Sequence, residues 1–279
     1  MRESEIRTAI LISGSGTTAR SILEAWKAGR FNNVAPVLLL ADRLNTNIEP
    51  IAEEFGVPYH VEQKKAHGKN LESFGDAINM MFKKYGVDFY GQHGWLSFTP
   101  DNVTSSLPGL NQHNGPLDPG RNEDWGGDFG GHKMYGPSVV ASRLAYSWIT
   151  DSDYWTESVV HHVGSEFDTG RLITADKFEY DIPDLAQPVT IKNLFDGSVE
   201  YLKEETERIW KGEDGKGKNG LLGLEHKNVV HAYELLDERG IGGLPSEERP
   251  TPLVPIEKRP VLAEIKTAVV TLYSAKKAA

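Results

Sequence analysis

The first 41 residues constrain the fold most, because two apolar runs flank a glycine turn and an amphipathic segment. The apolar runs cover residues 8–13 and 35–41, and Ile22, Leu23 and Trp26 recur between them at helical spacing. Near-continuous apolar strands that alternate with helices are typical of a parallel sheet with helices on both faces. The start of the chain therefore predicts an α/β fold.

The same alternation extends to about residue 210, apart from a glycine-rich segment, Gly115–Gly131, that predicts a long loop. Further strands are expected at residues 58–61, 88–94, 109–113, 157–163 and 172–180. Further helices are expected at residues 48–55, 71–85, 138–148 and 190–210. The pattern predicts a Rossmann-like, mostly parallel sheet.

The end of the chain has a different composition. Residues 212–220 are rich in glycine and charge and are typical of a linker. Two amphipathic segments follow at 225–238 and 260–276, and Leu262, Ile265 and Val269 share one helical face in the second. We predict a catalytic domain over 1–212 and a linker with a helical appendage over 213–279. The appendage is expected to dock on the catalytic domain or on a second copy in a homo-oligomer.

The composition excludes several classes of protein. Thirty basic and 40 acidic residues give a net charge of −10, which argues against a nucleic-acid-coating surface. The absence of cysteine excludes disulfides, thiolate zinc sites and thiol catalysis. No apolar run is long enough to cross a membrane, and the polar start is unlike a secretory signal. We therefore expect a cytoplasmic enzyme that acts on small molecules.

The glycine turn predicts a phosphate site with two interpretations. The run from Gly14 to Ala19 satisfies the pattern G-x-G-x-x-G/A, and Asp42 closes the second apolar run. This arrangement is typical of a dinucleotide site. Backbone amides at a helix N-terminus would equally bind a monophosphate, and a tight turn without a ligand remains a third interpretation.

Three polar residues predict acyl-transfer chemistry. Asn111 and His113 lie at the end of an expected strand, on one side of it, and Asp168 follows in a later turn. An amide and a protonated imidazole can stabilise an oxyanion, while a carboxylate orients the imidazole and relays a proton. In the glycine-rich segment, Trp125 and Phe129 would either form a lid over the site or pin the segment to the domain.

Four segments carry a resemblance to a known family. ISGSGTT (residues 12–18), LADR (40–43), GLNQH (109–113) and EFDTG (166–170) occur in the order seen in the folate-dependent formyltransferases. The chain resembles this family over about residues 5–212. The resemblance implies transfer of a formyl group from 10-formyltetrahydrofolate, as co-substrate, to the amine of glycinamide ribonucleotide in purine biosynthesis.

The resemblance also implies roles for individual residues. The catalytic residues would be Asn111, His113 and Asp168, with His161 in support. The substrate phosphate would bind Gly14, Ser15, Gly16, Thr17 and Thr18. The folate pocket would include Trp95, Leu96, Phe98, Glu166, Phe167 and Gly170. No metal is expected, since His161 and His162 lack a recognised metal-binding spacing.

Other functions stay open at this stage. The family's Glu-His pair before a tyrosine is absent, since Gly197 and Ser198 stand there before Tyr201. The acceptor would then be another amine, such as that of an amino-sugar nucleotide, or water in a hydrolase of 10-formyltetrahydrofolate. An NAD(P)-dependent oxidoreductase would use the glycine turn and Asp42. A formyltransferase-like chain without activity would instead bind a partner.

Overall fold

The sheet is the central element of the fold. The structure, a computed structural model, describes residues 5–44, 47–119, 128–181, 189–196, 200–213 and 215–275. Its strands are β1 (Ile6–Ile12), β2 (Val34–Ala41), β3 (Tyr59–Val61), β4 (Phe89–Gln92), β5 (Gly109–His113), β6 (Trp155–His162) and β7 (Leu172–Glu179). They form a sheet in the order β3-β2-β1-β4-β5-β6-β7, and the pairs from β3 to β5 are parallel. The predicted α/β fold with a mostly parallel sheet is confirmed.

Helices alternate with these strands and continue after them. The α-helices are α1 (Thr17–Lys27), α2 (Ile48–Phe55), α3 (Leu71–Tyr85), α4 (Asp101–Thr104), α5 (Pro137–Thr150), α6 (Ile191–Phe195), α7 (Glu200–Lys211), α8 (Leu221–Arg239) and α9 (Arg259–Ala275). Short 3-10 helices are η1 (Lys64–His67), η2 (Ile241–Gly243) and η3 (Ile256–Lys258). The single helix expected over 190–210 is wrong, because α6 ends at Phe195 and α7 begins at Glu200. The intervening Asp196, Gly197 and Ser198 are poor helix formers.

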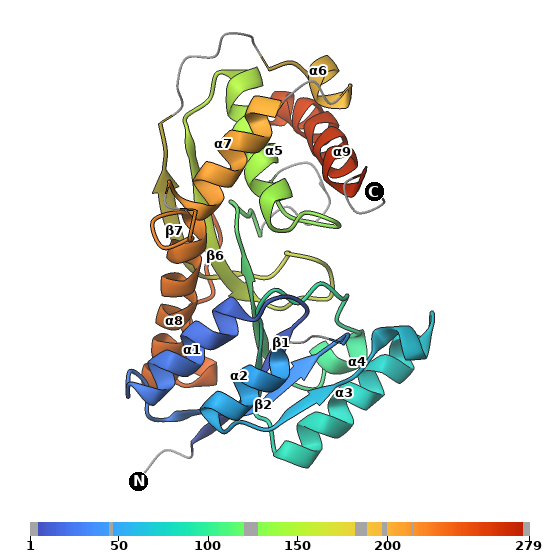
Figure 1. The fold of residues 1–279 in the computed structure, drawn as a ribbon, viewed down its shortest axis with the longest axis vertical. Helices are drawn as coiled ribbons and strands as arrows, with labels where there is room; N and C mark the ends of the chain where they lie inside the picture. Colours follow the sequence, from blue (N-terminus) through green and yellow to red (C-terminus); the bar gives the residue numbers. More distant parts are fainter. Residues whose placement is uncertain are drawn as a thin grey trace. The chain divides into compact units, whose positions relative to one another are not determined.

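The chain divides into two compact units. The first unit comprises Met1–Gln112, Val160–Ser165 and His226–Ser246, and the second comprises His113–Val159, Glu166–Glu225 and Glu247–Ala279. Most of α8 lies in the first unit and α9 lies in the second (Figure 1). The predicted division at residue 212, between a catalytic domain and an appendage, stays a prediction.

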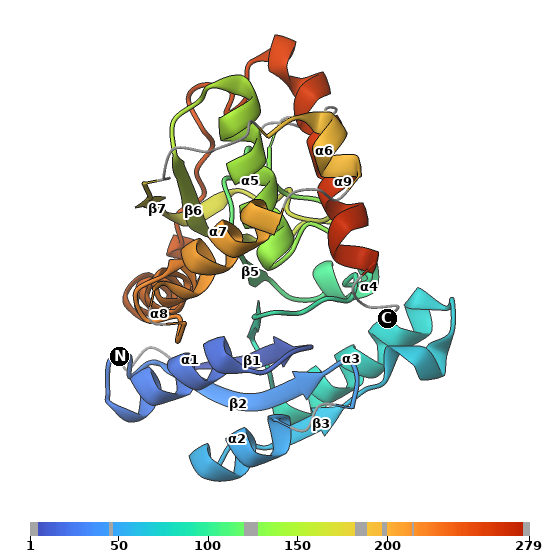
Figure 2. The ribbon, with the colours of Figure 1, turned by 45° about the horizontal axis from the view of Figure 1, so that its top comes forward.

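The first unit buries β1 on both faces. Leu11 of β1 packs in one hydrophobic cluster with Leu40 of β2 and Phe74 of α3. Figure 2 shows β1 and β2 side by side, as their parallel pairing requires. Ile12 points to the opposite face and is equally buried. The burial of both faces explains why this strand is apolar along most of its length.

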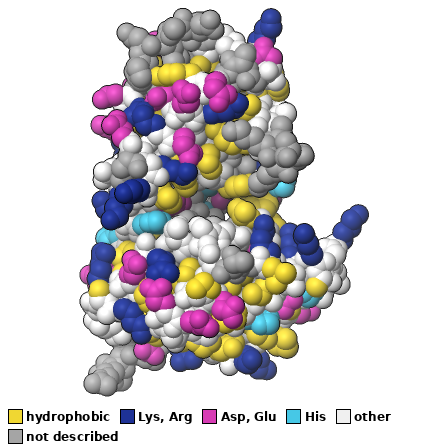
Figure 3. Space-filling model, in the orientation of Figure 1, with side chains coloured by type: hydrophobic (Ala, Val, Ile, Leu, Met, Phe, Trp, Pro, Cys, Tyr) yellow, Lys and Arg dark blue, Asp and Glu magenta, His cyan; other side chains and the backbone are white. Residues whose placement is uncertain are grey.

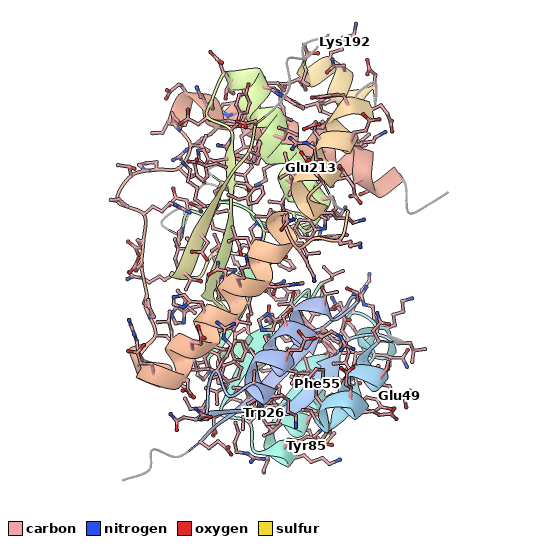
Figure 4. All side chains as sticks on the ribbon, turned by 60° about the vertical axis from the view of Figure 1, so that its left-hand side comes forward. Trp26, Glu49, Phe55, Tyr85, Lys192 and Glu213 are labelled. Carbon is pink, nitrogen blue, oxygen red and sulfur yellow. The ribbon has the colours of Figure 1, made fainter. Side chains whose placement is uncertain are left out.

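Helices α1 and α2 of the first unit are joined through their side chains. Trp26 lies near the end of α1 and Phe55 at the end of α2 (Figure 4). The Arg20 guanidinium is 5.7 Å from the centre of the Phe55 ring and 2.7 Å from a Glu54 carboxylate oxygen. Arg20, one turn after the glycine loop, is therefore paired with side chains of α2.

The second unit has its own core, built from α5, α7 and α9. Leu144, Leu202 and Leu262, one from each helix, are fully buried in one cluster. Ile265 and Val269 are buried in the same cluster, which confirms the apolar face expected in the last helix. None of the described helices is both long enough and apolar enough to span a membrane. Acidic and basic side chains are interspersed on the face shown in Figure 3.

The glycine-rich segment is anchored at its end. Phe129 is 1% exposed and packs edge-on against Tyr146, with ring centroids 5.6 Å apart. Trp125 lies outside the described residues. Of the two interpretations of Phe129, its burial in the core of the second unit supports the one in which it pins the segment to the body.

Candidate functional site

The glycine loop between β1 and α1 presents backbone to solvent. Gly14, Ser15 and Thr17 are exposed, whereas Gly16 and Thr18 are buried. Gly16 has φ +73°, and a Cβ there would lie 2.7 Å from a side-chain carbon of α2. Only glycine tolerates this combination of backbone conformation and close approach. The loop thus exposes the N-terminus of α1, which is suited to an anion.

Two side chains that sequence reasoning missed contact this loop within the first unit. The Gln112 Nε2 donates to Thr18 Oγ1 at 3.1 Å. The His226 Nε2 lies 3.3 Å from Thr17 Oγ1. Gln112 could have been found from the sequence, because it stands between the predicted site residues Asn111 and His113. His226 comes from α8, and no local pattern points to it.

A buried hydrogen-bond chain extends from Gln112 to α8. The Gln112 Oε1 lies 2.9 Å from His93 Nδ1, and His93 Nε2 lies 3.1 Å from the Tyr233 hydroxyl. Because the amide oxygen only accepts, His93 Nδ1 carries the hydrogen and Nε2 accepts from Tyr233. Burial lowers the pKa of His93 to about 4, although the Gln112 hydrogen bond opposes that shift. His93 is therefore a neutral imidazole at neutral pH.

Asp42 is engaged by neighbouring side chains. Arg43 donates to it at 2.8 and 2.7 Å, and Ser97 Oγ donates to Oδ2. Burial disfavours the charged form, but the hydrogen bonds from Arg43, Ser97 and Ser13 outweigh it and lower the pKa of Asp42. An aspartate that binds ribose hydroxyls would have to exchange these partners, which weakens the dinucleotide interpretation.

His113 and Asp168 form a buried pair in the second unit. Their relative exposures are 4% and 7%, and His113 Nδ1 lies 3.6 Å from Asp168 Oδ2. The backbone carbonyl of Phe129 lies 3.0 Å from His113 Nε2. A carbonyl only accepts, so Nε2 carries the hydrogen and Nδ1 faces the carboxylate. The structure thus brings together two of the three predicted catalytic residues.

The conformation of Asp168 is unusual. Its φ is +57°, a left-handed conformation that side-chain-bearing residues adopt infrequently. The Gly131 amide donates to its Oδ2 at 2.8 Å. Sparsely populated backbone conformations concentrate at functional sites, where the surrounding structure over-determines them. This conformation fixes the carboxylate in front of the imidazole.

Asn111 and His161 contact each other in the first unit. The Asn111 Nδ2 lies 3.2 Å from His161 Nε2, and His161 Nδ1 donates to the His162 carbonyl at 2.8 Å. The ring nitrogen that faces Asn111 therefore accepts, and the amide NH2 group donates to it. This orientation fits the supporting role expected for His161, which stays a prediction.

The residues expected to bind folate differ in exposure. Trp95 is 7% exposed and stacks on Phe74, with ring centroids 6.2 Å apart. Leu96 is 37% exposed, and Phe167 lies against His132 with ring centroids 5.9 Å apart. The others are half-buried or exposed: Phe98, Glu166 and Gly170. Trp95 is thus a core residue of the first unit, and a folate contact by any of these six stays a prediction.

No group of three or more His, Cys, Asp or Glu residues suited to a metal ion occurs among the residues that the structure describes.

Comparisons with known proteins agree with the resemblance. The chain matches no protein-family model. It is 27% identical over 220 residues to the chloroplastic phosphoribosylglycinamide formyltransferase of Arabidopsis thaliana, covering 75% of this chain and 68% of that protein. The corresponding protein of Glycine max is 24% identical over 218 residues, with 75% and 66% covered. The chain thus spans about two thirds of the length of these relatives.

Solved structures show the same fold. Glycinamide ribonucleotide transformylase 1 from Symbiobacterium toebii has a TM-score of 0.59 at 22% identity, covering 84% of this chain and 88% of that chain. Phosphoribosylglycinamide formyltransferase from Brucella melitensis has a TM-score of 0.56 at 18% identity, covering 88% and 100%. The predicted resemblance and the predicted Rossmann-like fold are confirmed.

Proposed function

We propose that this chain is a folate-dependent formyltransferase that transfers the formyl group of 10-formyltetrahydrofolate to the amine of glycinamide ribonucleotide, in purine biosynthesis. The observation that carries the proposal is the buried pair of His113 and Asp168, at 3.6 Å. The named relatives act in the same reaction class, and the four sequence segments occur in the order seen in that family. The folate is a co-substrate, and the reaction as proposed needs no metal.

The exposed glycine loop supports binding of the acceptor's phosphate. Backbone amides from Gly14 to Thr18 and the N-terminus of α1 would bind it, with the Ser15 and Thr17 hydroxyls as further donors. Among the residues expected at the folate, we propose Leu96, Phe98 and the segment Glu166–Gly170 as the lining of its pocket. Trp95 would then act by supporting this lining from the core.

The proposed reaction is an acyl transfer with balanced proton movement. The acceptor amine attacks the formyl carbon and forms a C–N bond, and the carbonyl oxygen gains negative charge. Asn111 would stabilise that oxyanion by hydrogen bonding, and His113 would join it by exchanging the Phe129 carbonyl for the oxyanion at Nε2. Asp168 would accept the proton of the attacking amine and pass it to the departing tetrahydrofolate nitrogen as the old C–N bond breaks. The buried His113 imidazole beside the carboxylate would hold this proton on Asp168 until it is passed on.

The experiment is an absorbance assay of tetrahydrofolate release with and without glycinamide ribonucleotide. We expect acceptor-dependent release, and a fall in kcat of about a hundredfold or more in Asp168→Asn, because the proton relay is lost. Asp151→Asn is the matched control, since Asp151 also has a left-handed φ, +51°, but is exposed. Equal rates in both variants would refute the role of Asp168.

Other outcomes separate the alternatives. Release without acceptor would indicate a hydrolase, and release only with an amino-sugar nucleotide would indicate another acceptor. Quenching of NADH fluorescence would indicate the oxidoreductase. The cytoplasm as the location, and a homo-oligomer formed through the C-terminal helices, are parts of the same proposal, and size-exclusion chromatography tests the oligomer.

A further inference from the structure

Lys266 of α9 binds the end of the glycine-rich segment. Its ammonium donates to the backbone carbonyls of Gly130, at 2.7 Å, and Asp128, at 3.1 Å. Lys266 is half-buried as a residue, and hydrogen bonds from a charged donor are stronger than neutral ones. Lys266 lies beyond residue 212, outside the four segments that carry the sequence resemblance to the family.

The same short segment contacts both members of the buried pair. The Phe129 carbonyl accepts the hydrogen of His113 Nε2, and the Gly131 amide donates to Asp168. Along residues 128–131, the backbone groups therefore form hydrogen bonds in turn with Lys266 and with the His113–Asp168 pair. A shift of the segment would turn the imidazole and move the carboxylate together.

The segment's own sequence does not fix its backbone. Gly130 and Gly131 follow Phe129, and Gly131 has φ +104°. Glycine is conformationally permissive, so such a segment needs external contacts to hold one conformation. Asp128 supplies one internal contact, because its carboxylate accepts from the amides of Asp118 and Gly130 at 2.8 and 3.0 Å. Phe129 is held by its buried ring and by its amide, which donates to the Pro116 carbonyl at 3.1 Å, and Lys266 of α9 binds the carbonyls on either side of it.

We propose that Lys266 is a positioning residue that holds residues 128–131 so that their backbone orients His113 and Asp168. The catalytic consequence rests on the proposed formyl transfer, whereas the orientation of the pair does not. Displacements of about 1 Å at a reacting group cost on the order of a hundredfold in rate. The proposal therefore predicts an effect on kcat rather than on substrate affinity.

The test compares two lysine variants of the full chain. Lys266→Met removes the ammonium and keeps a long apolar side chain. Lys258→Met is the matched control, because Lys258 also donates to a backbone carbonyl, but to that of Thr150 at 3.2 Å, at the end of α5. We expect kcat to fall about tenfold to a hundredfold in Lys266→Met, with each KM within about twofold of the parent. Lys266→Arg keeps a cationic donor and is expected to retain most of the parent's kcat.

A second measurement is independent of turnover. The ring ¹⁵N resonances of His113, assigned by their loss in His113→Asn, report its orientation and hydrogen bonding. We expect them to shift in Lys266→Met and to stay in place in Lys258→Met. Unmoved His113 resonances in Lys266→Met, or equal kcat losses in both methionine variants, would overturn the proposal. If the parent transfers no formyl group, the proposed function fails, and the resonances alone decide whether Lys266 positions His113.

Discussion

Acidification should destabilise the first unit through His93. This imidazole is fully buried between Gln112 and Tyr233, and burial lowers its pKa to about 4, from an ordinary value of 6.5. The unfolded chain gains a proton at this residue as the pH falls through 6.5, whereas the folded chain stays neutral until about pH 4. The contribution of His93 to the folding free energy is therefore fully present above pH 6.5 and is lost progressively as the pH falls from 6.5 to 4.

The size of the effect follows from the difference in pKa. A lowering of about 2.5 corresponds to about 3 kcal/mol of folding free energy once the pH is below 4. At pH 5 the unfolded chain is almost fully protonated at this residue, and the loss is about 2 kcal/mol relative to pH 8. Only 2% of the His93 surface is exposed, so solvent does not screen this effect.

Urea unfolding followed by circular dichroism at pH 8 and pH 5 measures the prediction. His93→Gln lowers stability at both pH values but lacks the titrating group, so it should lose about 2 kcal/mol less than the parent on acidification. His231→Gln is the control, because that side chain is 54% exposed and lies on the same helix as Tyr233. If His93→Gln and the parent lose the same stability between pH 8 and pH 5, the assignment of a neutral, proton-excluding His93 is refuted.

Two further predictions concern stability. Gly16→Ala should destabilise the protein by about 1–3 kcal/mol, because φ is +73° and the new Cβ meets a side chain of α2, whereas Gly14→Ala has open space; equal melting temperatures would contradict this. Arg249→Met should cost about 3 kcal/mol in chemical denaturation, because it leaves the nearly buried Glu157 carboxylate without its ion pair. Arg249→Lys should recover part of that loss, and a methionine variant as stable as the parent would count against the ion pair.

The sequence predicts the sheet well because the signals are local. The apolar runs at β1 and β2 have both faces buried, and the glycine turn between them is needed for φ +73° at Gly16. The division into units is not predictable in the same way, because distant pairs determine it. Arg30 pairs with Glu234 of α8 at 2.8 Å, and Asp237 accepts from the Asn33 amide. Amphipathic spacing predicts α8 as a helix but says nothing about which residues it contacts.

The candidate site shows the same limit. Residue type and spacing select His113 and Asp168, and the structure brings them within 3.6 Å. The groups that orient them are a backbone carbonyl, that of Phe129, and a backbone amide, that of Gly131. Every residue but proline has both groups, so no sequence pattern distinguishes these two. The sequence also does not show that Trp95 lies in the core, because an aromatic residue after a strand is as compatible with the wall of a ligand pocket as with a core.

The C-terminal segment bears on both parts of the candidate chemistry. His226 contacts Thr17 of the phosphate loop, and Tyr233 ends the hydrogen-bond chain that reaches Thr18, all within the first unit. Lys266 binds the segment beside His113 within the second unit. Side chains of residues 213–279 thus take part in contacts with the candidate site residues of each unit, and the division at residue 212 stays a prediction.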